Sequence, residues 1–257
     1  MQMPPFFYEI FSPSLPRLGP GDEGSTLRAL RWACSRIPRR DGPGGRGLRI
    51  LDLGCGTGAQ TIELARHTGD AITALDNHRP YLRELERRAA AGGVRDAVIA
   101  VPGDMGALDP GLGPWDLIWA EGSLFVVGFR NGLTLCRDRL APGGVLAASE
   151  LSWLRADAPE ECREYFASAY PGMQDVAANL LGIRDAGFEV VTHFAQPESA
   201  WWAPYYLPLE QRIAQLRSRP GLQPEDRGLL DDVELEIAMF RRYPGCYGNV
   251  FYVMQKR

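Results

Sequence analysis

The feature that most constrains the fold is an alternation that begins near Leu48, where short apolar runs are followed by segments with helical spacing. This pattern is typical of βαβ units, whose parallel strands form one sheet covered by helices on both faces. The sequence predicts five such strands, over residues 48–53, 71–76, 97–101, 115–120 and 144–149. Helices are expected between them, over residues 58–68, 79–91 and 129–140. The fold class is therefore α/β, with a doubly wound, mostly parallel sheet.

Both ends of the chain depart from this alternation. A helix is expected over Ser25–Ile37, and the Gly- and Pro-rich stretch Arg39–Gly47 is expected to be a loop. The elements expected after the fifth strand are a helix over 173–186, a strand over 188–194, two amphipathic helices over 205–218 and 225–242, and a last strand over 248–254. We expect the last strand to return antiparallel, which makes about seven strands with an N-terminal helical arm and a helical insertion at about 197–243.

Composition excludes several classes of protein. The chain has 257 residues, of which 45% are hydrophobic, and is predicted to form a single domain. Its 28 Lys and Arg against 32 Asp and Glu give a net charge of −4. The chain as a whole therefore lacks the positive field that binding to nucleic acid or membranes usually requires. No apolar stretch reaches the roughly 18 residues of a membrane span, and Pro4, Pro5 and Glu9 do not suit a signal peptide. We expect a soluble, cytoplasmic protein, as a monomer or homodimer.

The cysteines and histidines do not predict a metal site. Five scattered cysteines include no C-x-x-C pair, and three histidines stand far apart. Each histidine has an ordinary structural interpretation, which we favour for His193 on its expected strand, whereas His78 could lie at the edge of a ligand site. We therefore expect neither disulfides nor a bound metal.

The most informative segment is ILDLGCGTGAQTIELA, residues 50–65. Gly54, Gly56 and Gly58 allow a tight turn between a strand and a helix, and a ligand can approach both the turn and the free N–H groups of the helix. These glycines alone also suit a dinucleotide, because Gly54, Gly56 and Ala59 fit G-x-G-x-x-A.

A series of acidic residues at the strand ends helps to distinguish a dinucleotide from a positively charged cofactor. Asp52 precedes the first glycine, Asp76 closes the second strand and Asp104 follows the third. Asp76 suits the ribose of either cofactor, but Asp52 would place a like charge beside a pyrophosphate. A cofactor with a sulfonium and an ammonium is favoured there by Coulomb attraction.

Four motifs in this order resemble class I S-adenosylmethionine-dependent methyltransferases: D-x-G-x-G-x-G at 52–58, the strand-end Asp76, GDM at 103–105 and LAPGG at 140–144. WAEGSLFVVGF, SELSW and PESAWWAPYY are similar to small bacterial methyltransferases that modify small molecules. The resemblance implies a Rossmann-like fold divided into an arm (1–47), a cofactor-binding core (48–149) and acceptor-side elements (150–257). The residues it implies for S-adenosylmethionine are Asp52, Gly54, Gly56 and Gly58 at the turn, Asp76 at the ribose, Asp104 and Met105 at the adenine, and Ala120 with Glu121 at the methionine end.

Two carboxylates are candidates for the chemistry of transfer. Glu121 and Glu150 directly follow the fourth and fifth strands, where either could take a proton from a neutral acceptor. Glu121 could equally hold the cofactor's ammonium or cap the next helix, and Glu150 could be an exposed strand-end carboxylate. Tyr8, Trp153 and Trp201 are candidate walls of an acceptor pocket, although helix packing is the alternative for the aromatic residues of the insertion.

The leading hypothesis is therefore an enzyme that methylates a small molecule and releases S-adenosylhomocysteine. A methyltransferase acting on nucleic acid or protein is an alternative, although A-E-G-S at 120–123 differs from the N/D-P-P-Y/F motif of enzymes that methylate base amines. A cofactor-binding module without catalysis stays open. A dehydrogenase is the least favoured interpretation.

Overall fold

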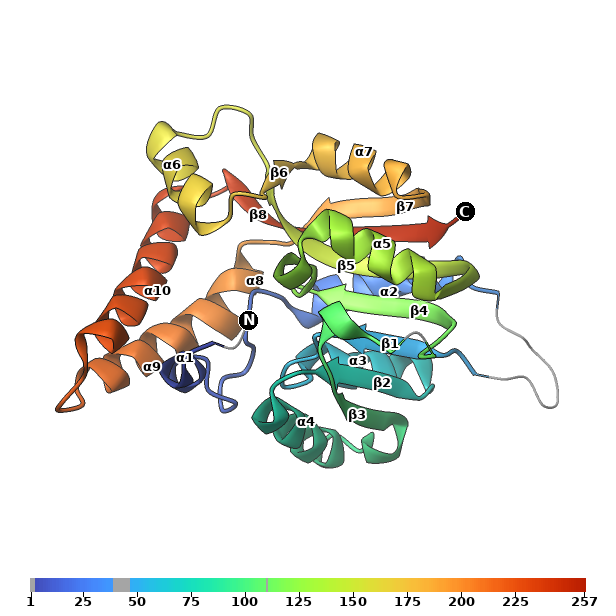
Figure 1. Ribbon diagram of the computed structural model, residues 1–257, viewed down its shortest axis with the longest axis horizontal. Helices are drawn as coiled ribbons and strands as arrows, with labels where there is room; N and C mark the ends of the chain where they lie inside the picture. The colour runs from blue at the N-terminus through green and yellow to red at the C-terminus, as the bar shows by residue number, and fades with distance from the viewer. Residues whose placement is uncertain (1–2, 39–46, 110) are drawn as a thin grey trace.

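The computed structural model describes residues 3–38, 47–109 and 111–257, and it contains one sheet with the strand order β3-β2-β1-β4-β5-β8-β7 (Figure 1). The strands of this order are β1 (Ile50–Leu53), β2 (Ile72–Asp76), β3 (Val98–Pro102), β4 (Trp115–Glu121), β5 (Leu140–Trp153), β7 (Phe188–Ala195) and β8 (Tyr247–Lys256). β8 runs antiparallel to β5 and β7, and the two-residue β6 (Gln174–Asp175) pairs beside β5. The predicted α/β sheet with an antiparallel last strand is confirmed.

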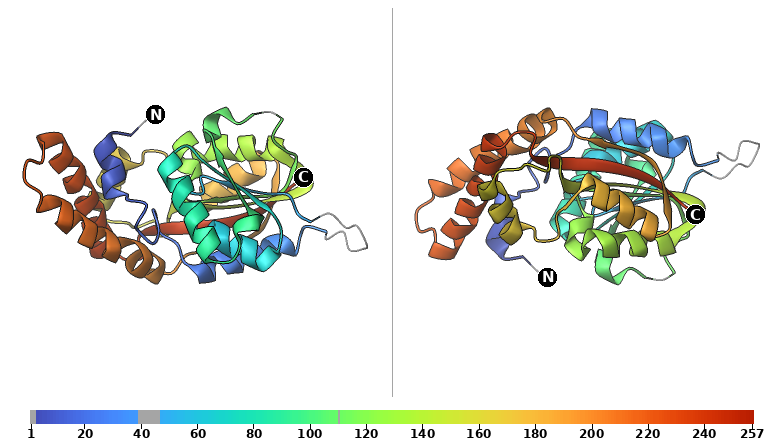
Figure 2. Two further views of the ribbon diagram at one scale, coloured as in Figure 1. Left: turned by 90° about the horizontal axis from the view of Figure 1, so that it is seen from below. Right: turned by 90° about the horizontal axis from the view of Figure 1, so that it is seen from above.

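Helices cover both faces of the sheet, as the two views in Figure 2 show. α2 (Glu23–Cys34), α3 (Ala59–Thr68) and α4 (Arg79–Ala91) pack with one apolar cluster that includes Trp119 and Phe251. α5 (Phe129–Arg139) and α7 (Val176–Asp185) pack with a second cluster that includes Ile118 and Tyr252. Alternate residues of β4 and β8 therefore face opposite layers, as the strand period of two requires.

The remaining α-helices form a separate lobe beyond the carboxyl ends of the parallel strands (Figures 1 and 2). This helical lobe consists of α1 (Pro5–Ile10), α6 (Glu160–Ala169), α8 (Ser199–Trp201), the π-helical turn η4 (Trp202–Tyr206), α9 (Leu207–Arg217) and α10 (Pro224–Arg242). Short 3-10 turns complete the structure: η1 (Arg95–Ala97), η2 (Met105–Ala107) and η3 (Leu124–Val127). Because ligands of open α/β sheets bind outside the carboxyl ends of the strands, the lobe adjoins the expected site.

Several elements differ from those expected from sequence; α2 ends at Cys34 rather than at Ile37, and α7 begins at Val176 rather than at 173. β5 begins at Leu140 rather than at 144, because Leu140 already pairs with Trp115; Pro142–Gly144 forms an irregularity before the pairing resumes at Val145, with Gly143 at a φ of 71°. α6 and β6 were not predicted. The expected loop over Arg39–Gly47 lies outside the described residues except for Gly47. In the described ranges, no helix combines the length and apolar character needed to cross a membrane.

Candidate functional site

The turn between β1 and α3 depends on three glycines in the left-handed region. Gly54, Gly56 and Gly58 have φ angles of 76°, 54° and 84°, which side chains other than glycine rarely adopt. The N–H groups of Gly54 and Cys55 donate to the carbonyl of Leu75 at 2.8 and 3.0 Å, which fixes the turn against β2. α3 follows directly at Ala59, and no side chain caps its first turn. The predicted strand–turn–helix is present and leaves backbone donors at the helix start.

Asp76 joins the end of β2 to this turn. Its Oδ2 accepts a hydrogen bond from the N–H of Gly56 at 3.0 Å, and its Oδ1 accepts one from the N–H of His78 at 2.8 Å. Burial raises the pKa of Asp76 above its usual value, whereas these two N–H groups lower it. The carboxylate that sequence analysis assigned to a ribose therefore lies at the glycine turn.

Asp52 lies beneath the turn rather than on its surface. The residue is fully buried, and its carboxylate accepts hydrogen bonds from the hydroxyl of Thr61 at 2.5 Å and from the amide of Gln60. Burial, together with smaller contributions from the charges of Glu121 and Asp76, raises the pKa of Asp52 to about 7. Asp52 thus fixes the first turn of α3 and lies close enough to Glu121 and Asp76 for their charges to affect its pKa.

The two residues expected at the adenine lie after β3. The Asp104 carboxylate is exposed and accepts a hydrogen bond from the N–H of Gly106 at 2.8 Å, which caps the short turn η2. Met105 is 8% exposed, and its Cε lies 3.1 Å from the position that a Cβ on Gly54 would take. Ala120, on β4, is fully buried in the second cluster. Met105 therefore lies against the turn, whereas Asp104 points to solvent.

Glu121 is held by partners from three elements. Its carboxylate accepts hydrogen bonds from Arg17 at 2.9 Å, from the Thr26 hydroxyl at 3.0 Å and from the Trp119 indole at 3.1 Å. Only 2% of the Glu121 side chain and 11% of the Arg17 side chain are exposed. Arg17 and Thr26 were missed in the sequence, because their contact with Glu121 spans about a hundred residues and carries no local signal.

The N-terminal arm lies over the glycine turn. Tyr8 stacks on His78 with ring centroids 3.8 Å apart, and Tyr81 donates its hydroxyl to the Phe11 carbonyl at 2.7 Å. Leu18 lies 3.1 Å from the position that a Cβ on Gly56 would occupy. The candidate Tyr8 is therefore brought beside the end of β2, next to Asp76.

Arg88 on α4 ties this arm down. Its guanidinium donates to the carbonyls of Pro13 and Leu15 at 2.9 and 2.7 Å. It also donates to the Pro16 carbonyl at 2.9 Å and to the Thr57 hydroxyl, within the glycine turn, at 3.1 Å. One side chain thus connects the arm, α4 and the turn, a role that the sequence did not reveal.

Glu150 is buried on the opposite face of the sheet from Glu121. β4 and β5 pair with Glu121 opposite Ser149, so the next residue, Glu150, points to the other side. Glu150 is 5% exposed and accepts a hydrogen bond from the Tyr170 hydroxyl. Burial raises the pKa of Glu150 to about 7. The interpretation of Glu150 as an exposed strand-end carboxylate is therefore wrong, and the two candidate carboxylates do not form a pair.

Trp153 and Trp201 both belong to the helical lobe's apolar cluster. Trp201 is 4% exposed and stacks on Phe240 with centroids 4.4 Å apart. Trp153 is partly buried, meets Phe166 edge to face at 5.6 Å and carries the Arg163 guanidinium over its ring. The surroundings of Trp201 are those of a core side chain, whereas Trp153 keeps an accessible surface.

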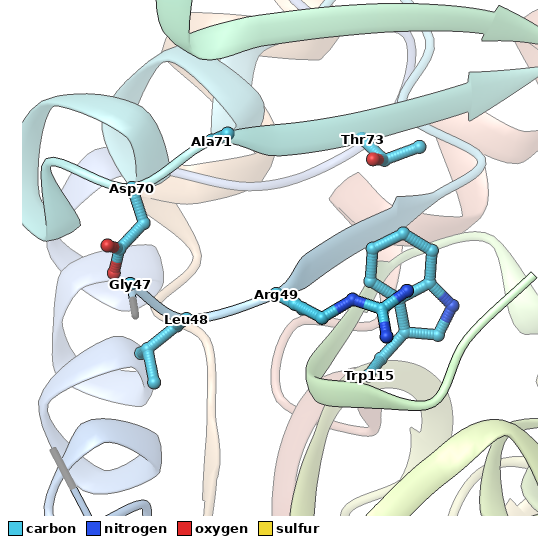
Figure 3. A pocket seen from close by; sticks show the side chains of 7 residues that line it. All are labelled: Gly47, Leu48, Arg49, Asp70, Ala71, Thr73 and Trp115. Carbon is cyan, nitrogen blue, oxygen red and sulfur yellow. The ribbon is translucent and has the colours of Figure 1, made fainter. Parts of the chain in front are cut away.

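Two of the hollows in the described structure lie toward opposite ends of the parallel strands. One, of about 550 Å³, lies beside the glycine turn and is lined by Pro16, Arg17, Asp22, Glu23, Ala59, Glu63, Ser199, Ala203 and Pro204. The other, of about 360 Å³, contains Arg49 and Trp115 and lies at the amino ends of the strands (Figure 3). There the Arg49 guanidinium lies 5.1 Å from the Trp115 ring centroid. The second hollow therefore lies at the opposite end of the strands from the glycine turn and does not suit a ligand of that turn.

The sheet order, the antiparallel β8 and the glycine turn after β1 define the Rossmann-like class I methyltransferase fold. Comparison with known proteins agrees, because residues 50–144 match a family model described as a methyltransferase domain. The predicted resemblance is confirmed over residues 50–144, which match the methyltransferase domain, and the fold is that of the class I enzymes.

Individual relatives give a consistent result. A sterol 24-C-methyltransferase of Gibberella zeae is 27% identical over 182 residues, which cover 67% of this chain and 47% of that protein. The crystal structure of YjhP from Escherichia coli superimposes with a TM-score of 0.81 at 22% identity, covering 99% of this chain and 100% of that one. A SAM-dependent methyltransferase of Thiobacillus denitrificans, in complex with S-adenosyl-L-homocysteine, has a TM-score of 0.76 at 22% identity, with both chains fully covered. The chain spans about half the length of the first curated relatives it matches.

Proposed function

We propose that this protein transfers the methyl group of S-adenosylmethionine to a small-molecule acceptor and releases S-adenosylhomocysteine. The observation that carries the proposal is the arrangement of three carboxylates, on Asp52, Asp76 and Glu121, around one glycine turn. The charges of Asp76 and Glu121 are near enough to raise the pKa of Asp52. A cationic sulfonium and ammonium are attracted to such a site, whereas a pyrophosphate would be repelled.

The residues of the site fit this cofactor. Asp76, buried at the end of β2 with its carboxylate at the turn, would accept the ribose hydroxyls. Met105 would pack on the adenine, with Asp104 at its edge. The glycine turn and the segment Ala120–Glu121 would contact the methionine end, where Glu121 would meet the ammonium and Arg17 lies beside it. In this assignment Glu121 orients the arm and the cofactor, because its oxygens already accept from three donors.

The cofactor supplies a methyl group on a positively charged sulfur, and in-line transfer to an acceptor removes that charge. The work of the chain is then to position the two reactants and to exclude water. The arm residues Tyr8 and Leu18, held over the turn by Arg88, would close the cofactor side. Trp153 would form part of the acceptor side, where its ring is only partly buried. Trp201 would support this wall from the core of the helical lobe.

A small-molecule acceptor is supported by the net charge of −4. The sterol 24-C-methyltransferase relatives also have a small molecule, a sterol, in their name as the compound acted on. We further propose that the chain acts in the cytoplasm, as a single-domain monomer or homodimer, without nucleic-acid or membrane partners. Size-exclusion chromatography with light scattering and cell fractionation test these points; a stable higher oligomer or a membrane-bound fraction would contradict them.

Calorimetry tests the cofactor. S-adenosylmethionine and S-adenosylhomocysteine should bind, and NAD should not. Asp76→Ala should weaken binding of S-adenosylhomocysteine by about 1–3 kcal/mol, the scale of lost charge-assisted hydrogen bonds. Asp70→Ala is the control, because Asp70 lies by the opposite end of β2 and lines the hollow there. NAD binding without response to the other two ligands would overturn the proposal.

A second assay separates an enzyme from a binding module. Release of S-adenosylhomocysteine is measured with a panel of thiols, phenols, alcohols, amines and carboxylates, each offered to the cofactor-loaded protein. Turnover with any member supports the enzyme. Tight cofactor binding without turnover across a broad panel favours the module.

A further inference from the structure

The surroundings of Glu150 form a second polar cluster at the strand ends, one residue beyond the Glu121–Ser149 pair of β4 and β5. Glu150 is 5% exposed, and its Oε1 accepts the hydrogen bond from Tyr170. Over the described ranges, Oε2 has no hydrogen-bond donor and is also not among the fully buried oxygens without a partner, so it keeps some contact with solvent. A buried carboxylate with one oxygen anchored and the other open is suited to receive a proton.

Tyr170 connects this carboxylate to the segment after β4. It is the C-cap residue of α6, where its N–H donates to the Phe166 carbonyl and its own carbonyl accepts from Met173, each at 3.0 Å. Its ring meets Phe125 edge to face, with centroids 6.4 Å apart and an interplanar angle of 82°. Phe125 belongs to η3, which begins three residues after Glu121. Tyr170 and Phe125 therefore bridge the ends of β5 and β4.

An apolar surface adjoins the carboxylate. Phe125 and Val126 are 54% and 59% exposed, which is unusual for two adjacent large apolar side chains. The Phe125 ring contacts Tyr170, whose hydroxyl reaches Glu150, so the apolar surface and the carboxylate are continuous through one side chain. A ligand that covers both would carry an apolar body and a polar hydrogen-bond donor.

The neighbouring ionisable groups leave Glu150 to act as a base near neutral pH. Burial raises the pKa of Glu150 to about 7, although the hydrogen bond from Tyr170 acts in the opposite direction. From β8, Tyr252 faces the same side but is engaged with the Ser152 hydroxyl at 3.1 Å and the Asn179 amide at 3.3 Å. Asp175, which caps α7, acts electrostatically on Tyr252. The described contacts place no cation on Glu150, in contrast to Glu121 with its Arg17 partner.

We propose that Glu150 is the general base of the transfer, that Tyr170 is its positioning residue, and that the acceptor is a neutral alcohol, phenol or amine whose apolar body packs on Phe125. This inference rests on the proposed methyltransferase function. The acceptor's O–H or N–H proton passes to Oε2 of Glu150, and the freed electron pair forms the bond to the methyl carbon. The carbon–sulfur bond breaks with its electron pair remaining on sulfur, which becomes a neutral thioether. An anionic acceptor is repelled by the same carboxylate.

The first test measures the titration of Glu150 in the protein loaded with S-adenosylhomocysteine. Carbon-13 NMR of side-chain-labelled glutamate follows the carboxyl, and Glu150→Gln identifies its signal by loss. The expected pKa lies near 7 and rises in Tyr170→Phe, because the hydrogen bond that favours the ionised form is gone. Tyr165→Phe, a change in the same helix at a ring that packs on Phe166, is the control. An ordinary glutamate pKa, or one unmoved by Tyr170→Phe, overturns the assignment.

The second test measures acceptor chemistry with fluorinated probes. Fluorine NMR compares 4-fluorobenzyl alcohol with 4-fluorobenzoate on the protein loaded with S-adenosylhomocysteine at pH 8. The alcohol should bind about tenfold more tightly, because the carboxylate probe meets a like charge, and Glu150→Gln should reduce this preference. Phe125→Ala should weaken alcohol binding several-fold, whereas Trp32→Ala, an exposed aromatic on α2 across the sheet, should not.

The outcomes separate this inference from the function it rests on. If S-adenosylhomocysteine does not bind the wild-type chain, the proposed function fails. If S-adenosylhomocysteine binds, three outcomes overturn only the acceptor assignment. These are no binding of the alcohol, equal binding of the benzoate, and equal effects of Phe125→Ala and Trp32→Ala.

Discussion

Gly58 shows how one residue can fix the geometry of the cofactor turn. Its φ of +84° is a left-handed conformation, and a Cβ there would lie 2.0 Å from Cδ1 of Leu85. Gly58→Ala should lower the free energy of unfolding by about 2–4 kcal/mol, through backbone strain and overpacking. Gly69→Ala is a matched control with φ +70° and no atom within 4 Å, and it should cost only about 1–2 kcal/mol. Urea denaturation measures both; equal losses would show that Leu85 yields freely.

Asp52 makes stability depend on pH. Because its folded-state pKa is raised from 3.8 to about 7, the protonated form favours folding. That contribution is fully present below the unfolded-state pKa and is lost as pH rises through 7. Asp52→Asn removes this loss, so its stability relative to wild type should improve by about 1–3 kcal/mol from pH 5 to pH 8. Urea denaturation of the ligand-free proteins at both pH values checks this; a difference that does not change with pH would mean an ordinary pKa for Asp52.

At the scale of elements, the arm is an appended segment whose position depends on α4. Both Arg88, 18% exposed, and its neighbour Arg87, 69% exposed, pair with Glu84, but Arg88 also donates to three arm carbonyls and to Thr57. Arg88→Ala should accelerate hydrogen exchange of residues 7–18 and cost about 1–3 kcal/mol of stability. Arg87→Ala should do neither. Hydrogen-exchange mass spectrometry decides; equal protection of the arm in both variants would show that Arg88 is dispensable.

For the whole molecule, β8 connects the three apolar clusters. Tyr247 belongs to the cluster of the helical lobe, Phe251 to the cluster under α2, and Tyr252 to the cluster under α5. A strand shared in this way makes separate unfolding of the lobe costly, so we expect one cooperative transition. Far-UV circular dichroism and tryptophan fluorescence should give coincident thermal curves. Two resolved transitions would contradict this expectation.

Because β8 contributes to all three apolar clusters, a substitution in this strand should affect all probes together. Phe251→Ala, at a fully buried position, should cost about 3–5 kcal/mol and shift both thermal curves equally. Phe125→Ala, at a position 54% exposed, should change stability by less than about 0.5 kcal/mol. A shift confined to one probe would show that the sheet and the lobe unfold independently.

The sequence by itself determined the parallel sheet, the glycine turn and the strand-end position of Asp76. These depend on periodicity, on backbone freedom and on the order of strands, which are local properties. α6, a regular helix between β5 and α7, was not predicted from the sequence. The start of β5 was misplaced, since the pairing of Leu140 with Trp115, ahead of the irregularity at Pro142–Gly144, depends on the neighbouring strand.

Only the tertiary structure decided which groups meet at the site. The pairing of Glu121 with Ser149 places Glu150 on the other face of the sheet, which separates two carboxylates that sequence order presented as neighbours. Arg17 reaches Glu121 from 104 positions away, and Tyr170 reaches Glu150 from a helix end. Strand register, and the way distant segments of the chain pack together, bring these side chains into contact. Such contacts depend on the simultaneous packing of distant segments, and no local pattern of residues specifies them.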